Sequence, residues 1–193
     1  MYKLSNYYKT QDVWTLFLIS AFPLHVWTLL LGFQDISWLA ERTNFFDALS
    51  VISYGLVFAL FESLLLLVVV LLLGLLISTK WGRSLRVGML GMMVTCLSLI
   101  SMISQLYYLM GWSFSEQVIE FLTQTNHPLW WVYGVSLAAI FVLFAPSVYI
   151  LFSKKLLSIW EAIADRLSLL MIMYLLFDLF AVCIVIYRNV SGA

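Results

Sequence analysis

Three ionisable side chains stand inside long apolar stretches of the sequence. Glu62 interrupts the run LVFALFESLLLLVVVLLL (56–73), while His25 and Asp178 lie in two other apolar runs. Counted at 1.5 Å per residue from the span ends expected on one side of the membrane, they lie roughly 18 Å (His25), 22 Å (Glu62) and 16 Å (Asp178) deep. An imidazole and two carboxyl groups at one level are the groups of a proton or cation site.

The same three residues also allow a structural interpretation. A carboxylate near the centre of a span costs about 2.5–3.5 kcal/mol, so it is kept only when paired, hydrated or protonated. Glu62 and Asp178 would then be hydrogen-bonding links that fix the register of the helices, with His25 as one partner. Because Glu62 follows Ala59 by three residues, we expect it beside the small-residue face of its helix, pointing into the bundle. We favour this interpretation over ion transport, and both over catalysis.

Motifs of known enzyme and metal chemistry are missing from the sequence. It contains no CxxC, HExxH, P-loop, GxGxxG or GxSxG pattern. Its second histidine, His127, precedes Pro128 in a predicted loop, and Cys96 and Cys183 fall within apolar segments as packing residues. We therefore expect no cofactor and no metal, and an enzyme is not favoured. An intramembrane lipid-modifying enzyme is the weakest of the alternatives.

The composition indicates a membrane protein. Of the 193 residues, 64% are apolar and 10% are charged, whereas a soluble domain is about half apolar and a quarter charged. The net charge is zero and no block of like charges occurs, so nucleic-acid binding is not expected.

Hydropathy predicts an all-α, polytopic membrane protein with five transmembrane helices and short loops. The second span can begin at Phe45, after Asn44 as N-cap with Asp47 three residues on, which makes a helix roughly 50 Å long. No stretch outside the spans is long enough to hold a core, so residues 1–193 form a single transmembrane domain. The five predicted spans are 13–33, 49–77, 88–110, 129–152 and 167–187.

Small residues and prolines mark where these helices should meet or bend. Small side chains let helix backbones approach in lipid, and a proline frees the carbonyl four residues before it. We expect kinks at Pro23 and Pro146. The small residues expected at helix contacts are Gly55, Ala59, Gly88, Gly91 and Gly134.

Two polar stretches predict amphipathic helices at the membrane surface. In SFSEQVIEFLTQ, Ser113 and Glu116 have the spacing of a capping box. The stretch 154–165 has a polar stripe opposite apolar residues, which predicts either a second in-plane helix or a cytoplasmic extension of the last span.

The distribution of Lys and Arg predicts the orientation. Eight of them fall in the N-terminal tail and the loops after spans two and four, whereas Arg42 and Arg188 fall on the other side. This bias places the N-terminus in the cytoplasm and the C-terminus outside, in a plasma (inner) membrane.

The leading functional hypothesis is a non-catalytic membrane subunit or scaffold that packs against other chains or against copies of itself within the lipid bilayer. It follows from the lack of a soluble domain, the lack of a catalytic motif and the apolar outer faces. The alternative is a small proton- or cation-coupled carrier or channel that uses the acids near the midplane.

Overall fold

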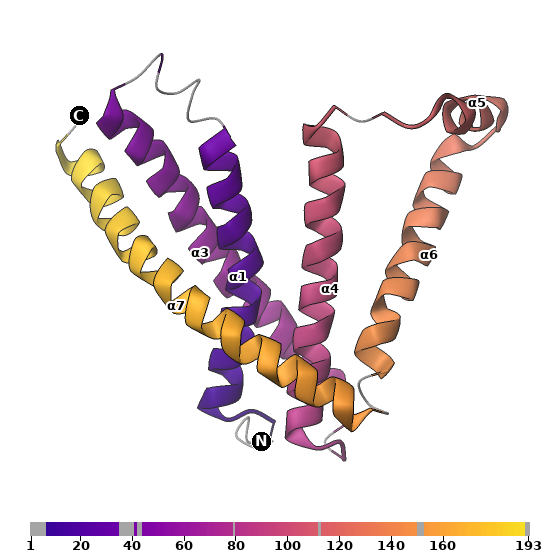
Figure 1. Ribbon diagram of the computed structural model, residues 1–193, viewed down its shortest axis with the longest axis horizontal. Coiled ribbons are helices and arrows are strands. Elements are labelled where there is room, and N and C mark those ends of the chain that lie inside the picture. The colour runs from indigo at the N-terminus through magenta and orange to yellow at the C-terminus, as the bar shows by residue number, and fades with distance from the viewer. Residues whose placement is uncertain are drawn as a thin grey trace.

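The computed structural model of the protein describes residues 7–34, 41, 44–78, 80–111, 113–149 and 153–191, without the side chains of residues 108, 140, 143, 144 and 146. Every regular element within these residues is a helix (Figure 1). The helices are α1 (Thr10–Gln34), α3 (Phe45–Leu76), α4 (Arg83–Leu109), α5 (Glu116–Gln124), α6 (Pro128–Tyr149) and α7 (Lys154–Ser191).

Four of the described helices are long and apolar enough to cross a membrane, namely α1, α3, α4 and α7. The prediction of an all-helical fold is therefore confirmed for the described residues, and these four helices are consistent with a helical membrane protein. The predicted span 129–152 corresponds to α6, which is not among these four, so five spans are not confirmed.

α1 is the central helix of the bundle. Its consecutive residues Leu16 to Ala21 are all buried, so every side of this helix is covered there. The covering helices are α3, α4 and α7, as Figure 1 shows. One apolar cluster joins Leu16 and Ile19 of α1 to α3, α4 and α7, and a second joins Phe17 and Leu18 to Met171 of α7.

α3 begins where the sequence predicts. The Asn44 side chain accepts a hydrogen bond from the backbone N–H of Asp47 at 2.9 Å, which satisfies one of the free donors of the first turn. The helix continues for 32 residues, roughly 48 Å. Its far end is joined to the segment that precedes α1 by the Tyr8 hydroxyl, which donates to the carbonyl oxygen of Leu71 at 3.1 Å.

α7 is one continuous helix of 38 residues. The polar stretch 154–165 is therefore an extension of the last span, the second of the two alternatives. Its first half packs on α4, where a Cβ atom added to Gly91 would lie 2.6 Å from Cζ2 of Trp160. Figure 1 shows α7 crossing the lower part of α1 on its way to the opposite end of the molecule.

Among the described helices, α5 and α6 contact the rest of the molecule only through α4. α6 contacts α4 and α5, and it diverges from α4 towards the end that carries α5 (Figure 1). The predicted capping box at Ser113 and Glu116 is wrong, because the N-cap of α5 is Ser115 and it makes no side-chain cap. The helix therefore begins at Glu116, directly after Ser115.

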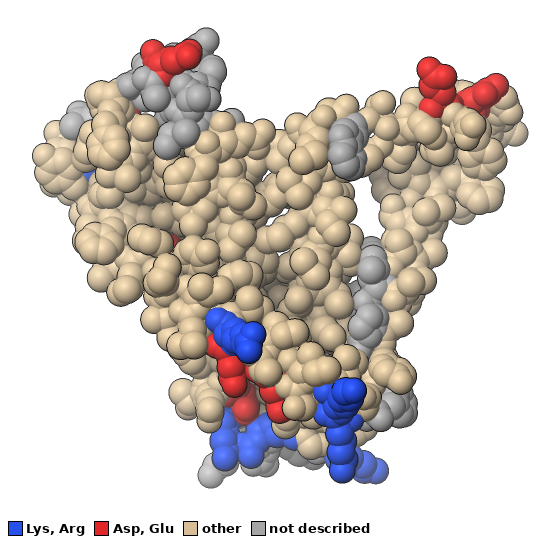
Figure 2. Space-filling model, in the orientation of Figure 1, with Lys and Arg blue, Asp and Glu red and all other residues tan. Residues whose placement is uncertain are grey.

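Lys and Arg side chains gather at one end of the molecule, beside the start of α1 and the connection between α3 and α4 (Figure 2). The last turn of α7 lies at the opposite end (Figure 1). There Arg188 forms an ion pair with Asp47, with 3.1 Å between Nη2 and Oδ1.

Candidate functional site

His25 of α1 and Asp178 of α7 form a buried pair. Nε2 of His25 lies 2.8 Å from Oδ2 of Asp178, and the two residues expose 0% and 2% of their surface. The sequence predicts these two residues at one depth, and the structure places them in contact. Their hydrogen bond joins two helices, through residues that are 153 positions apart in the sequence.

The second ring nitrogen of His25 determines how many protons the pair holds. Nδ1 lies 2.8 Å from the carbonyl oxygen of Ala21, one turn earlier in α1. A carbonyl oxygen only accepts, so Nδ1 carries a hydrogen and donates it. The contact between Nε2 and Oδ2 then contains one proton, either on the imidazole beside a carboxylate or on the carboxyl group beside a neutral imidazole. Both arrangements leave the pair without net charge.

Only one of the two carboxyl oxygens of Asp178 is hydrogen-bonded to a described residue. Its Oδ1 atom is buried and has no hydrogen-bond partner in the described part of the chain. A buried acceptor without a donor costs about 1–3 kcal/mol. The site thus combines one strong interhelical bond with one unsatisfied oxygen.

Glu62 does not join this pair, which differs from the prediction that it points into the bundle. Ala59 and Ser63 of α3 expose 1% and 0% of their surface, but Glu62 is exposed, as are Phe58 and Phe61. At 100° per residue, Glu62 is turned about 60° from Ala59 and about 100° from Ser63. That rotation moves its side chain past the edge of the inner face.

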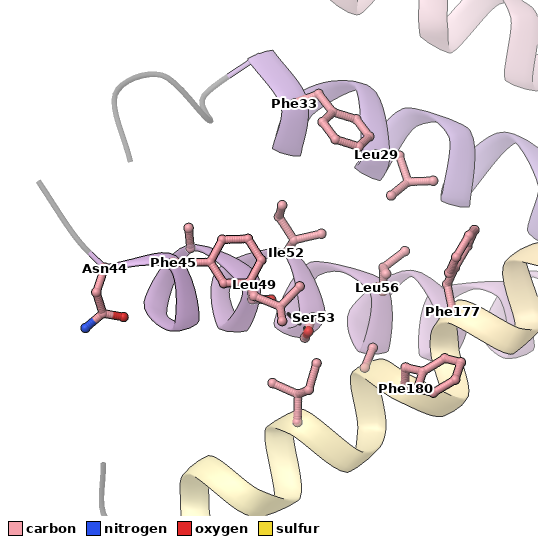
Figure 3. Close-up of a pocket in the computed structure, with 13 residues that line it drawn as sticks. Leu29, Phe33, Asn44, Phe45, Leu49, Ile52, Ser53, Leu56, Phe177 and Phe180 are labelled. Carbon is pink, nitrogen blue, oxygen red and sulfur yellow. Dashed lines mark hydrogen bonds between the residues drawn. The ribbon is translucent and has the colours of Figure 1, made fainter. Parts of the chain in front are cut away.

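An apolar cavity of about 670 Å³ lies one helical turn beyond the pair (Figure 3). Leu29 of α1 is four residues after His25, and Ala181 of α7 is three residues after Asp178. In Figure 3, Phe177 and Phe180 of α7 face side chains of α3 across this space. Neither His25 nor Asp178 lines the cavity. Its walls are suited to hydrocarbon rather than to an ion.

Of the small residues expected at helix contacts, all but Gly134 lie between helices. A Cβ atom added to Gly88 would lie 2.6 Å from Cδ1 of Leu157, and one added to Gly55 would lie 3.1 Å from Cγ2 of Thr28. Ala59, Gly88 and Gly91 are likewise buried between helices. Gly134 differs from the prediction: it is exposed, and an added Cβ would meet no atom within 4 Å. The reason is that α6 diverges from α4.

Neither proline ends its helix. α1 continues from Thr10 to Gln34 through Pro23, two residues before His25. α6 continues to Tyr149 through position 146, whose side chain lies outside the described part of the structure.

Arg86 is the polar residue whose role the sequence did not reveal. We predicted it in a loop, yet α4 begins at Arg83 and Arg86 exposes 4% of its surface. Its Nη2 donates to the carbonyl oxygen of Tyr7 at 3.1 Å, and its guanidinium lies 5.5 Å from the centre of the Tyr7 ring. Only the packing of the N-terminal segment against α4 reveals this contact.

A polar cavity of about 360 Å³ lies near the same end, between α1, α4 and α7. Asp12, Glu161 and Asp165 line it, and the Ser84 hydroxyl donates to Oε1 of Glu161 at 2.6 Å. Among the described residues, no group of three or more His, Cys, Asp or Glu side chains is arranged to hold a metal ion.

Fold and site together define a helical, membrane-embedded protein whose central helix is joined to its last helix by a buried imidazole–carboxyl pair. Comparison with known proteins adds no relative, because no protein-family model, curated protein or solved structure matches this chain.

Proposed function

We propose that this chain is a non-catalytic membrane subunit or scaffold whose helices pack against another membrane-spanning chain. The observation that carries the proposal is the exposure of α6. Among the described side chains of this helix, Ser147 alone is buried.

α6 nevertheless has residues that suit helix packing. Gly134 and Ala138 are exposed, lie four residues apart and therefore share one face. Small residues at this spacing let two helices approach closely in lipid. Figure 2 shows the molecule hollowed between α4 and α6. An open face of this kind fits a helix from another chain better than it fits a helix of this one.

The buried pair supports the same proposal, because it suits a fixed link better than a path for ions. His25 is completely buried, and neither it nor Asp178 lines the apolar cavity beside it. A transported ion or proton needs a hydrated route to the group that binds it. The pair instead holds α1 against α7.

A proton-coupled carrier is the second candidate, and one observation favours it. The pair shares one proton, and Oδ1 of Asp178 has no partner among the described residues. If this oxygen receives a transported proton, Asp178→Asn blocks proton flux in liposomes while the thermal stability stays near that of the wild type. Equal flux in both kinds of vesicle would reject the carrier.

The proposed orientation follows the clustering of positive charge. Lys and Arg gather at the end that holds the start of α1 (Figure 2). Cytoplasmic loops carry such an excess. This supports a cytoplasmic N-terminus and an external C-terminus in a plasma (inner) membrane.

Native mass spectrometry of the protein, extracted gently from its own membrane, tests the subunit proposal. We expect a stoichiometric complex with a second membrane protein. A monomer or homo-oligomer that carries out robust proton flux in liposomes would overturn it.

A further inference from the structure

Glu62 is an ionisable residue that the described part of the chain leaves without a partner. It lies near the middle of the 32 residues of α3 and is exposed. No ion pair or hydrogen bond joins it to any described residue. At such a depth, an unpaired carboxylate facing hydrocarbon costs about 2.5–3.5 kcal/mol. A group from outside this chain would remove that cost.

Exposed residues on either side of Glu62 lie along one face of α3, which we name the Glu62 seam. Its members follow one another at steps of three, four and seven residues, the spacing by which one helix packs along another. All of them are exposed. The Glu62 seam consists of Val51, Phe58, Glu62, Leu65, Val69 and Leu72.

A groove of about 230 Å³ between α1, α3 and α4 lies beside this seam. Leu66 lines it and is one turn from Glu62 on α3, so the two side chains share a side of the helix. From α4 the groove receives Ser101 and Gln105, both exposed. Neither has a hydrogen-bond partner among the residues that the structure describes. Polar side chains of α4 thus line the groove, and Glu62 lies one turn from the residue with which α3 lines it.

The partner of Glu62 is best sought in a different protein. All ten Lys and Arg residues of this chain lie at or near the ends of the apolar spans. A second copy would therefore bring no cationic side chain to the depth of Glu62. Its imidazole at that depth, His25, is completely buried and already bonded to Asp178.

We propose that the Glu62 seam binds a transmembrane helix of another protein, and that a Lys or Arg of this helix pairs with Glu62 near the middle of the membrane. The inference rests on the proposed function and specifies the partner: an apolar helix with one basic residue at mid-depth. Polar atoms of the same helix reach Ser101 and Gln105 in the adjacent groove. The charge on Glu62 selects the partner, while the apolar seam supplies the contact surface.

Association of the full chain with model helices in lipid vesicles tests the pairing. The probe is a fluorescent Leu/Ala peptide of about 20 residues with one central Lys, and the matched peptide carries Leu there. Because polar contacts between helices in lipid contribute about 1–2 kcal/mol, energy transfer should report roughly tenfold tighter binding of the Lys peptide. Glu62→Gln should remove this preference. Leu64→Gln, at almost the same depth on another face of α3, should retain it.

Three results of the vesicle experiment would overturn the proposal: equal binding of both peptides to the wild type, an undiminished preference for Lys in Glu62→Gln, or self-association of the wild type that Glu62→Gln abolishes. The last would assign the seam to a second copy. Circular dichroism and thermal unfolding establish that each variant is folded.

Native mass spectrometry of wild type and Glu62→Gln from the native membrane separates this inference from the proposed function. A partner lost only in the variant supports both. A partner retained by both proteins keeps the subunit function and rejects the Glu62 seam. No partner with either protein rejects the subunit function itself.

Discussion

Replacing the buried pair by apolar residues should be less harmful than breaking it. His25→Leu leaves both oxygens of Asp178 without a donor, and Asp178→Val leaves Nε2 of His25 without its partner. Each single variant loses the interhelical hydrogen bond and strands a buried polar atom, a cost of about 1–3 kcal/mol. The double variant strands neither, because both polar groups are gone.

The expected size of this effect follows from the surroundings of the pair. In lipid the unfolded reference state is also dry, so interhelical hydrogen bonds contribute about 0.6–2 kcal/mol rather than the larger values of buried ion pairs in water. We therefore expect a coupling free energy of roughly 1–2 kcal/mol between the two positions. Asp178→Asn should be the mildest change, since its amide N–H can donate to Nε2 of His25 and preserve the bond.

Steric trapping in bicelles measures the free energy of unfolding of the wild type, the two single variants, the double variant and Asp178→Asn. Retained helicity by circular dichroism is the control for folding. Additive single effects, within about 0.5 kcal/mol, would refute the reasoning. So would an Asp178→Asn variant as unstable as Asp178→Val, because the hydrogen bond would then contribute nothing.

Three further substitutions test the helix contacts. Gly91→Ala places a Cβ atom 2.6 Å from the buried ring of Trp160 and should lower the free energy of unfolding by about 1–3 kcal/mol. Gly134→Ala is the control, because its Cβ atom meets open space. It should change the free energy of unfolding by less than about 1 kcal/mol in the same assay. Tyr8→Phe removes the bond to Leu71, at a cost of about 0.5–1.5 kcal/mol. Burial raises the pKa of Tyr8 above its usual 10.0; its contribution to stability is therefore present below about pH 10 and lost as the pH rises through the raised value. Unfolding followed from pH 8 to 11 should show a steeper alkaline loss for the wild type than for Tyr8→Phe, and equal slopes would contradict this account.

Local signals predicted the helices well. Long apolar runs predicted α1, α3, α4 and α7, and the pairing of Asn44 with Asp47 predicted the start of α3. A cap depends on residues a few positions apart, so the sequence contains all the information it needs. The capping box at Ser113 was wrong because the spacing alone does not show which serine begins the helix.

The candidate site depended on information that is not local. Equal depth placed His25 and Asp178 at one level, but their contact requires α1 and α7 to be neighbours, which no local pattern reveals. Glu62 was misplaced for a related reason. Its position about 60° from Ala59 lies at the edge of the inner face, and the packing of the neighbouring helices decides on which side of that edge a residue falls.

The two acids, Asp178 and Glu62, should therefore have different roles. Asp178 satisfies part of its hydrogen-bonding capacity within the chain, so its substitution should change the stability of the bundle and leave the Glu62 seam intact. Glu62 is exposed, and its substitution should leave stability nearly unchanged while it weakens the binding of a basic helix. If both acids served one proton path, substitution of either would abolish the same flux. The pattern across the Asp178 and Glu62 variants therefore separates a scaffold from a carrier even before the partner is identified.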